Sequence, residues 1–340
     1  MRKPHRSAGP KPKPKETTLS SSTRRKQNAK SSKTGVPRKS IKTISASALK
    51  RKNFPPLHYA IDGYLTEGVT LLGGKPKIGK SYMALDFAMA VASGGLALGA
   101  VECQQGAVLY CALEDNHRRL QRRMQQLYGT EETWPRDLHF ATSAPRLDEG
   151  LLDELRNWIE GNQAKLIIID TFAGVRPQGR GEGYDADYAA LSPLQVMAGE
   201  LGVAILVIHH LRKMQGDDPF DTISGTTGLT GAVDAAFVLQ RGQQGVTLYG
   251  RGREIEEMEK ALEFDGGSWT VLGDASDVRR SEERGAILAV LSDASSPIGP
   301  KDIADALGKP ENNVKQLLFK MHKDGEIKKR GRGQYCIPDT

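Results

Sequence analysis

The feature that most limits what this chain of 340 residues can fold into is a glycine-rich loop that begins at residue 74. It follows the pattern G-x-x-x-x-G-K-[ST] between a short apolar run, 68–73, and a helical stretch, 82–92. In that setting the loop N–H groups and the helix N-terminus cradle phosphates. We expect Lys80 to reach the β- and γ-phosphates of ATP, and the Ser81 hydroxyl to coordinate Mg²⁺. The residues predicted to contact ATP are Gly74, Lys75, Pro76, Lys77, Ile78, Gly79, Lys80, Ser81 and Tyr82.

Apolar runs typical of buried strands recur along the middle of the chain, and most of them alternate with helical stretches. Such alternation predicts an α/β fold with a mainly parallel sheet covered by helices on both faces. The expected strands are 107–112, 166–170, 204–209, 235–239 and 246–249, and the expected helices include 116–128 and 151–160. We therefore expect one P-loop domain over residues 53–275.

The net charge of +7 is distributed unevenly, because residues 1–52 carry 17 Lys and Arg against the single acid Glu16. This N-terminal segment is rich in Lys, Ser, Pro and Thr and has few large apolar residues. Such a composition predicts a disordered basic tail. A basic tail attracts nucleic acid through counterion release, although a purely solubilising linker is the alternative.

Acidic residues end two of the predicted strands. Asp170 follows the apolar run 166–169, which is the position expected of a carboxylate that orients Mg²⁺ beside the phosphate loop. Glu114 follows the run 108–113 and is our candidate general base for the attack of water on ATP. The alternative is that Glu114 and Asp115 cap the helix that begins near residue 116, and we favour that alternative for Asp115.

Two later strands end in residues suited to the same chemistry. His209 and His210 end the run 205–208, a position from which a side chain can sense the γ-phosphate, and the alternative for one of the two histidines is a structural role. Arg251 and Arg253 end a late strand and are candidate arginine fingers for a neighbouring subunit's γ-phosphate. A solvated hairpin tip is the alternative for the two arginines.

The pattern changes after residue 275, and residues 281–340 are expected to form a winged helix. Helices are expected over 284–291, 300–307 and 312–324, followed by a basic hairpin with a glycine turn. The third helix of such a unit enters the major groove and the wing contacts phosphates, although the same fold also docks proteins. The candidate DNA contacts here are Asn312, Asn313, Lys315, Gln316, Lys328, Lys329, Arg330 and Arg332.

Neither a membrane span nor a secretory signal is apparent in the sequence, so we expect a soluble, cytoplasmic protein without membrane contact. The three cysteines, Cys103, Cys111 and Cys336, lack metal-type spacing, and we interpret them as ordinary buried thiols.

Together these motifs resemble the hexameric replicative helicases with a RecA-like core, DnaB-like and closest to the plasmid RepA type found in mobile elements and phages. The resemblance covers residues 54–274, and its most specific stretches are 73–81, 110–115, 169–171, 209–213 and 224–234. It implies a RecA-like P-loop ATPase that assembles into a ring of subunits, with ATP between neighbours.

The resemblance also assigns roles. Glu114 would be the catalytic carboxylate, Asp170 would lie on the metal side and His210 would sense the γ-phosphate, with Arg251 and Arg253 acting in trans. Segments 179–188 and 214–227 would be channel loops that hold single-stranded DNA. These segments contain the aspartates Asp185, Asp187, Asp217, Asp218 and Asp221, and the nearby cations are Arg180, Arg212 and Lys213. We therefore expect the winged helix and the basic tail to supply DNA affinity.

The sequence thus predicts an ATP-dependent DNA helicase or translocase of plasmid, phage or integrated-element replication. It would form a homo-oligomer, normally a hexamer, use ATP and Mg²⁺, bind single-stranded or duplex DNA, and work with a primase or initiator partner. Two alternatives stay open: a RecA-like recombination or repair ATPase, and an ATP-gated DNA-binding regulator or replication initiator that acts through the winged helix.

Overall fold

The computed structural model describes residues 41, 43–54, 56–131, 133–178, 184–211, 218–223, 228–242, 244–331 and 333–338. The chain divides into two compact units, 1–55 and 56–340. In the first unit, α1 (Ala46–Lys50) begins at Ser45, whose hydroxyl accepts a hydrogen bond from the Ala48 N–H. The prediction of disorder throughout 1–52 is therefore wrong for this helix, for which a serine cap and four helix-forming residues, Ala46, Ala48, Leu49 and Lys50, give the local reason. Residues 1–40 and 42 of the predicted tail lie outside the described residues.

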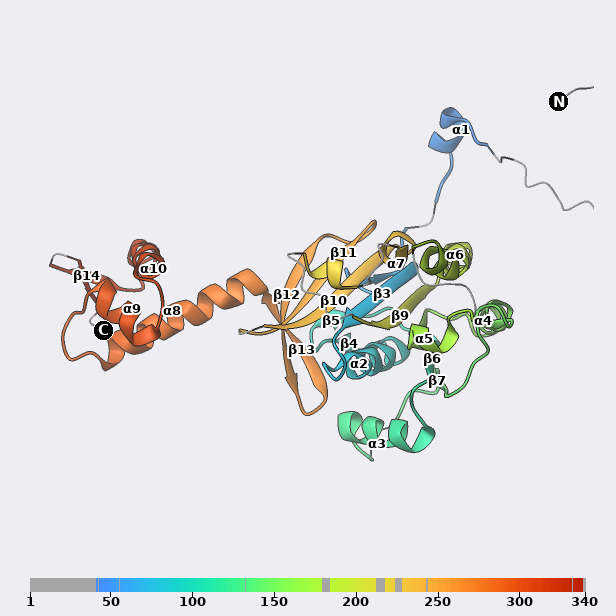
Figure 1. Cartoon of the computed structure of the whole chain (residues 1–340), viewed down its shortest axis with the longest axis horizontal. Coiled ribbons are helices and arrows are strands. Elements are labelled where there is room, and N and C mark those ends of the chain that lie inside the picture. Colours follow the sequence, from blue (N-terminus) through green and yellow to red (C-terminus); the bar gives the residue numbers. More distant parts are fainter. Residues whose placement is uncertain are drawn as a thin grey trace, which may run out of the picture. The chain divides into compact units, whose positions relative to one another are not determined.

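A nine-stranded sheet forms the centre of the second unit, in the order β13-β12-β11-β10-β3-β9-β8-β6-β7 (Figure 1). The strands from β10 to β7 in that order run parallel, and β11, β12 and β13 add an antiparallel meander at one edge. The bounds are β3 (Gly68–Gly74), β6 (Val108–Ala112), β7 (Leu138–Ala141), β8 (Leu166–Asp170), β9 (Ala204–His210), β10 (Ala235–Gly242), β11 (Gly245–Gly252), β12 (Met258–Asp265) and β13 (Ser268–Asp274). The predicted mainly parallel α/β sheet is confirmed.

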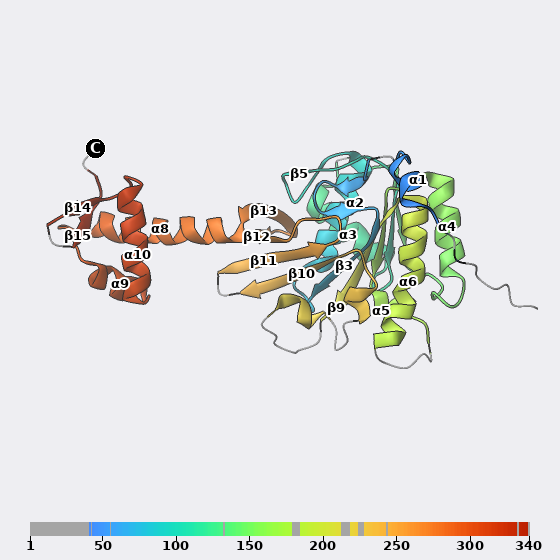
Figure 2. The same ribbon diagram turned by 90° about the horizontal axis from the view of Figure 1, so that it is seen from above.

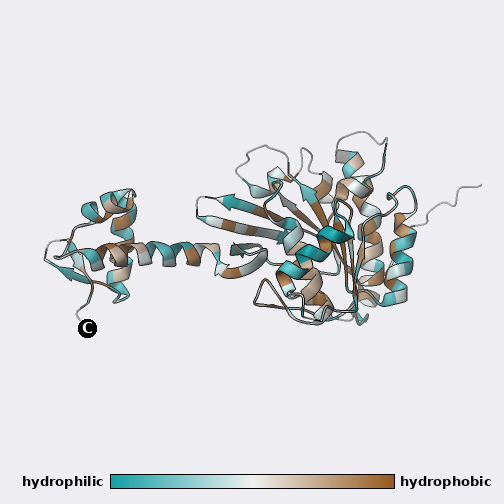
Figure 3. Ribbon diagram, turned by 90° about the horizontal axis from the view of Figure 1, so that it is seen from below, coloured by the Kyte–Doolittle hydropathy of each residue, from teal (hydrophilic) through white to brown (hydrophobic). Residues whose placement is uncertain are grey.

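Helices cover both faces of this sheet (Figure 2). Alternate residues of the central strands face opposite ways: Leu166 and Ile168 pack in the core that contains α2 (Lys80–Ser93) and α3 (His117–Tyr128). Ile167 and Ile169 pack on the other face with α4 (Leu151–Asn162), α5 (Phe172–Val175) and α6 (Tyr184–Leu201). The strands are accordingly hydrophobic along their length (Figure 3), as expected for a sheet buried on both sides.

Smaller elements complete the description of this part. They are the strand pairs β1 (Tyr59–Ile61) with β2 (Leu65–Thr66) and β4 (Leu96–Ala97) with β5 (Val101–Glu102), the 3₁₀ helix η1 (Pro219–Thr222) and the short helix α7 (Gly228–Gly231). Of the helices in the described ranges, none is long and apolar enough to cross a membrane.

The C-terminal elements are α8 (Ala275–Asp293), α9 (Pro300–Leu307), α10 (Glu311–Lys323) and the hairpin of β14 (Lys328–Arg330) with β15 (Gln334–Cys336). They share a hydrophobic core of their own, which includes Ile287, Ile303, Leu318 and Met321. The expected helices and hairpin are thus present, and their assignment as a winged helix stays a prediction.

Two boundaries differ from those expected. The predicted domains leave residues 276–280 between them, but α8 begins at Ala275 and runs through this interval, because a solvent-exposed helix tolerates the same polar residues as a linker. The predicted channel loop 179–188 overlaps α6, which begins at Tyr184 and contains Pro193. An internal proline obscures the helical pattern in the sequence.

A buried carboxylate on α2 makes the stability of this domain depend on pH. Asp86 accepts a hydrogen bond of 2.7 Å from the Leu98 N–H, and burial raises the pKa of Asp86 to about 6. Because the folded-state pKa is raised, stability falls as pH rises from the unfolded-state value through about 6. Asp86→Asn keeps an acceptor for Leu98 and should raise the free energy of unfolding at about pH 8 by up to about 3 kcal/mol, with no gain at about pH 4. Thermal unfolding followed by circular dichroism at the two pH values measures this difference, and an equal gain at both would contradict it.

Candidate functional site

The carboxyl ends of the parallel strands lie together along one side of the sheet, which is called here the first edge; the amino ends of the same strands form the second edge. His210, the last residue of β9, lies opposite Gly74, and Asp170, the last residue of β8, lies opposite Ile208. Ala112 ends β6 opposite Asp170, which brings Glu114 to the same edge. Ligands of open α/β sheets bind at this edge. The structure therefore brings together residues that are far apart in the sequence.

The loop between β3 and α2 has the backbone conformation that phosphate binding needs. Gly79 has φ 108°, and a Cβ added to it would lie 2.7 Å from Cζ2 of Trp269. The indole N–H of this tryptophan donates a hydrogen bond of 3.0 Å to the Gly79 carbonyl, so β13 fixes the loop from behind. Within the described residues, no side chain caps the N-terminus of α2. Its first N–H groups thus suit an anionic ligand.

Lys80 lies almost entirely inside the protein, with 4% of its surface exposed. Its Nζ donates hydrogen bonds to the carbonyls of Gly74 at 2.6 Å and Lys75 at 3.1 Å, and it lies 3.3 Å from Nδ1 of His210. Burial lowers the pKa of Lys80 to about 8, against the opposite influence of Asp170 and Glu114. A desolvated ammonium group of this kind is stabilised when an anion binds beside it.

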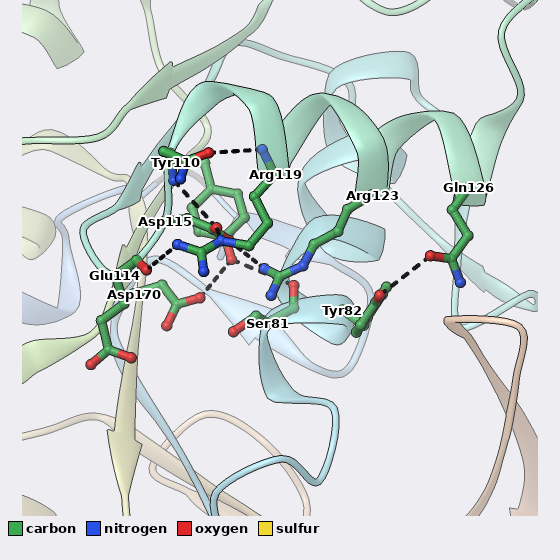
Figure 4. Close-up of polar contacts among 10 residues, drawn as sticks. Ser81, Tyr82, Tyr110, Glu114, Asp115, Arg119, Arg123, Gln126 and Asp170 are labelled. Atoms are coloured by element: carbon green, nitrogen blue, oxygen red, sulfur yellow. Dashed lines mark hydrogen bonds and ion pairs between the residues drawn. The ribbon is translucent and has the colours of Figure 1, made fainter.

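Asp170 is a buried carboxylate held by hydroxyl groups. It accepts a hydrogen bond of 2.7 Å from the Tyr110 hydroxyl (Figure 4). The Ser81 side chain is a second hydrogen-bond partner of Asp170. Burial raises the pKa of Asp170, and these two hydrogen bonds oppose that shift. A carboxylate and a serine hydroxyl side by side are hard oxygen ligands, so the two residues predicted to hold Mg²⁺ fit the ion.

Tyr110 is a site residue that the sequence analysis missed. It lies within β6 and is fully buried, yet its hydroxyl reaches the end of β8. The available signal was a tyrosine in an otherwise apolar strand, because a buried tyrosine hydroxyl usually has a hydrogen-bond partner.

Glu114 is held beside the loop but keeps its carboxylate exposed. Its Oε1 accepts a hydrogen bond of 2.9 Å from the Thr171 hydroxyl, and its Oε2 lies 3.7 Å from Nε2 of His210. Since the Lys80 ammonium group can only donate, Nδ1 of His210 accepts and Nε2 carries the proton that faces Glu114. His210 therefore connects the loop lysine with the predicted general base, while the catalytic roles of both residues stay predictions.

The start of α3 corrects the prediction for Asp115. Asn116, not Asp115, caps the helix, with its side chain accepting a hydrogen bond of 3.0 Å from the Arg119 N–H. The Asp115 carboxylate instead forms ion pairs with Arg119 and Arg123 (Figure 4). Arg123 also lies 5.4 Å from the ring centroid of Tyr82. The same carboxylate also accepts a hydrogen bond of 3.3 Å from the Asn116 N–H, so the charged arginines bind it in addition to the backbone.

Arg251 and Arg253 are not part of this cluster. Arg251 lies opposite Ala236 on β10, which lies opposite Leu71 in the middle of β3. The Arg253 N–H donates to the Asp234 carbonyl, and the Asp234 N–H donates to the carbonyl of Val69 near the start of β3. The two arginines therefore lie away from the carboxyl ends of the parallel strands and toward their amino ends. Together with η1 they line a cavity of about 420 Å³.

Acidic and aromatic side chains hold the two arginines there. Arg251 forms ion pairs with Asp218 at 3.0 Å and Glu257 at 2.7 Å, and its guanidinium lies 4.5 Å from the Phe220 ring centroid. Arg253 lies 3.4 Å from Asp234.

The candidate DNA contacts are only partly described. Arg212, Lys213 and Arg332 lie outside the described residues, as do Arg180 and Asp217. Lys315 pairs with Glu311 at 2.8 Å, and Lys328, Lys329 and Arg330 lie exposed on β14.

Two of the acids expected to weaken DNA binding are paired with arginines. Asp187 is buried on α6 and binds Arg176 at 2.6 Å, and Asp218 binds Arg251. Neither therefore adds a full negative charge to the segments predicted to be channel loops.

The comparisons with known proteins agree with this geometry. Residues 36–216 match the family model AAA_25, described as an AAA domain, and the chain belongs to this family. The predicted RecA-like P-loop ATPase core is thereby confirmed. The chain is also similar to the crystal structure of a KaiC-like protein from the hyperthermophilic archaeon Pyrococcus horikoshii OT3, with 17% sequence identity, a TM-score of 0.45, and coverage of 62% of this chain and 93% of that one. No curated protein matches the sequence.

Removing the hydroxyl that binds Asp170 tests the metal assignment. Tyr110→Phe leaves the carboxylate with one donor fewer and should raise the Mg²⁺ concentration needed for half-maximal ATP hydrolysis by about tenfold. The matched control is Tyr128→Phe, which removes a half-buried tyrosine hydroxyl from α3 away from Asp170. An unchanged Mg²⁺ requirement in Tyr110→Phe would show that Asp170 does not hold the ion.

Proposed function

We propose that the protein is a ring-forming, Mg²⁺-dependent ATPase that translocates on or unwinds DNA during replication of a plasmid, phage or integrated element. The observation that carries the proposal is the separation of the predicted site residues between two edges of one sheet. Lys80, Asp170 and Glu114 lie at one edge, and Arg251 and Arg253 lie toward the other. In a head-to-tail assembly, unlike surfaces of neighbouring subunits meet. One subunit would then supply the phosphate loop and the next would supply the arginines.

Residues of the first edge would prepare ATP for hydrolysis. The loop and Lys80 would hold the phosphates, and Ser81 and Asp170 would hold Mg²⁺, which neutralises phosphate charge when bound. The exposed Glu114 carboxylate would accept a proton from the attacking water. Thr171 and His210, which contact its two oxygens, would orient it.

Residues of the second edge would stabilise the transition state in the neighbour's site. Arg251 and Arg253 are long and partly exposed. The partners of Arg251 are the exposed carboxylates of Asp218 and Glu257, and the partner of Arg253 is the largely buried carboxylate of Asp234. Exposed ion pairs contribute only about 0–1 kcal/mol each. An arginine that exchanges an exposed carboxylate for the γ-phosphate of a neighbouring ATP therefore loses little free energy. A guanidinium can also bind a phosphate through two parallel hydrogen bonds.

A second candidate function is an ATP-gated DNA-binding regulator or replication initiator. It is favoured by the separate hydrophobic core of α8, α9 and α10 and by the exposed basic strand β14, which suit a DNA-binding module. A RecA-like filament-forming ATPase would use the same phosphate loop, and a primase or initiator is the partner expected of the helicase. A shared site between subunits separates the helicase from a regulator that works as a monomer.

Mixing two inactive variants tests the shared site. Lys80→Ala removes the phosphate-binding lysine, and Arg251→Ala removes the proposed finger, so each pure variant should hydrolyse ATP at least about a hundredfold more slowly than the parent. In an equal mixture, about a quarter of interfaces would combine an intact loop with an intact arginine, and about a quarter of the parental rate should return.

The matched control is the mixture of Lys80→Ala with a double variant that carries both substitutions, in which no interface is complete. Absence of recovery in the first mixture, in variants that still assemble, would contradict catalysis in trans by Arg251.

A further inference from the structure

We infer that the solvent-facing side of α10 is a contact surface for duplex DNA in which the Phe319 ring touches the base edges. The inference rests on the proposed function only in taking DNA as the partner, and it requires neither a ring nor ATP hydrolysis.

Phe319 is a large apolar side chain that the fold itself does not use. The inward side of α10 is occupied by Val314, Leu318 and Met321, which lie in the C-terminal hydrophobic core. Phe319 is 66% exposed on another side of the helix. Burial of such a ring removes apolar surface from water, so a partner surface that covers it gains binding energy.

The neighbours of Phe319 on the helix surface are polar. Lys315 and Gln316 precede it by one turn and Lys323 follows it by one turn, and all three are exposed. Gln316 also lines a cavity of about 470 Å³ between α8 and α10, together with Asn313 and Lys320. Amide side chains hydrogen-bond base edges, and an apolar ring packs on the methyl group of thymine.

The charge around this surface favours DNA. The sequence from 315 to 332 contains the cations Lys315, Lys320, Lys323, Lys328, Lys329, Arg330 and Arg332. Its two acids, Asp324 and Glu326, are both ion-paired with Arg284 of α8. The hairpin that follows α10 therefore adds positive charge beside the helix, which suits contact with phosphates.

A protein partner would require a different surface. Among the described residues from 275 to 338, the only exposed large apolar side chains are Phe319 and Ile337, and the side chain of Ile337 is 38% exposed. Phe319 is the only one of the two that lies on α10. Protein interfaces bury a central apolar cluster within a polar rim. One ring among amides and cations instead matches a helix placed in the major groove, where direct contacts to bases are mixed polar and apolar.

The test uses the full-length chain with Lys80→Ala, so that nucleotide turnover does not contribute, and a short duplex enriched by this protein from a random pool. Fluorescence anisotropy measures its affinity over a range of salt concentrations. Phe319→Ala should bind about tenfold more weakly with an unchanged salt slope, because the ring contacts bases and not phosphates. Lys329→Gln should lower the slope by about 0.9, as expected for the loss of one phosphate contact.

The matched control is Val196→Ala, which shortens an exposed apolar side chain on α6. It should leave the affinity and the slope unchanged. Parental duplex affinity in a folded Phe319→Ala variant would overturn the inference, and a change of oligomer mass without loss of affinity would show that Phe319 contacts protein instead. Failure of the mixed-variant ATPase experiment would contradict the shared site and leave this result unaffected, so the two proposals fail separately.

Discussion

The parallel alignment of β3, β9, β8 and β6 is the constraint on which the rest of the site depends. Their register places Gly74 opposite His210 and Asp170 opposite both Ala112 and Ile208. Because parallel strands end at the same edge, four separate segments contribute to one cluster without any long loop. Burial of both faces of the sheet fixes this register, since a shift by one residue would turn apolar side chains such as Ile168 toward the wrong core.

Within that frame, the phosphate loop is supported from two sides. Trp269 closes behind Gly79, and the carbonyls of Gly74 and Lys75 hold the Lys80 ammonium group. Burial makes this charge costly until an anion arrives, and the same low-dielectric setting strengthens its attraction for phosphate. Arg251 lies outside this frame and is held by Asp218, Glu257 and Phe220. The division of roles between two edges is the basis of the proposed assembly.

The phosphate loop and the strands around it could be predicted from the sequence because strong local patterns specify them. The loop 74–81 and the strands that end at Asp170 and His210 have apolar runs, glycines and polar ends that specify their own positions. The features that could not be predicted from the sequence depend on tertiary contacts. The Tyr110 hydroxyl meets Asp170 only once β6 lies beside β8. The strand β12, whose only buried residue is Leu262, has little apolar pattern that would indicate a strand. Likewise, Asp115 was expected to cap α3, but its choice of Arg119 and Arg123 depends on side-chain geometry that spacing does not determine.

The central claim is that one chain holds half of an ATPase site, which a neighbour completes. Electron microscopy of the purified protein with a non-hydrolysable ATP analogue and single-stranded DNA tests it most directly. The account predicts closed rings, normally of six subunits as in the helicases that the sequence resembles, with Arg251 of one subunit at the phosphates of the next. Particles that remain monomeric at saturating analogue and DNA would contradict it.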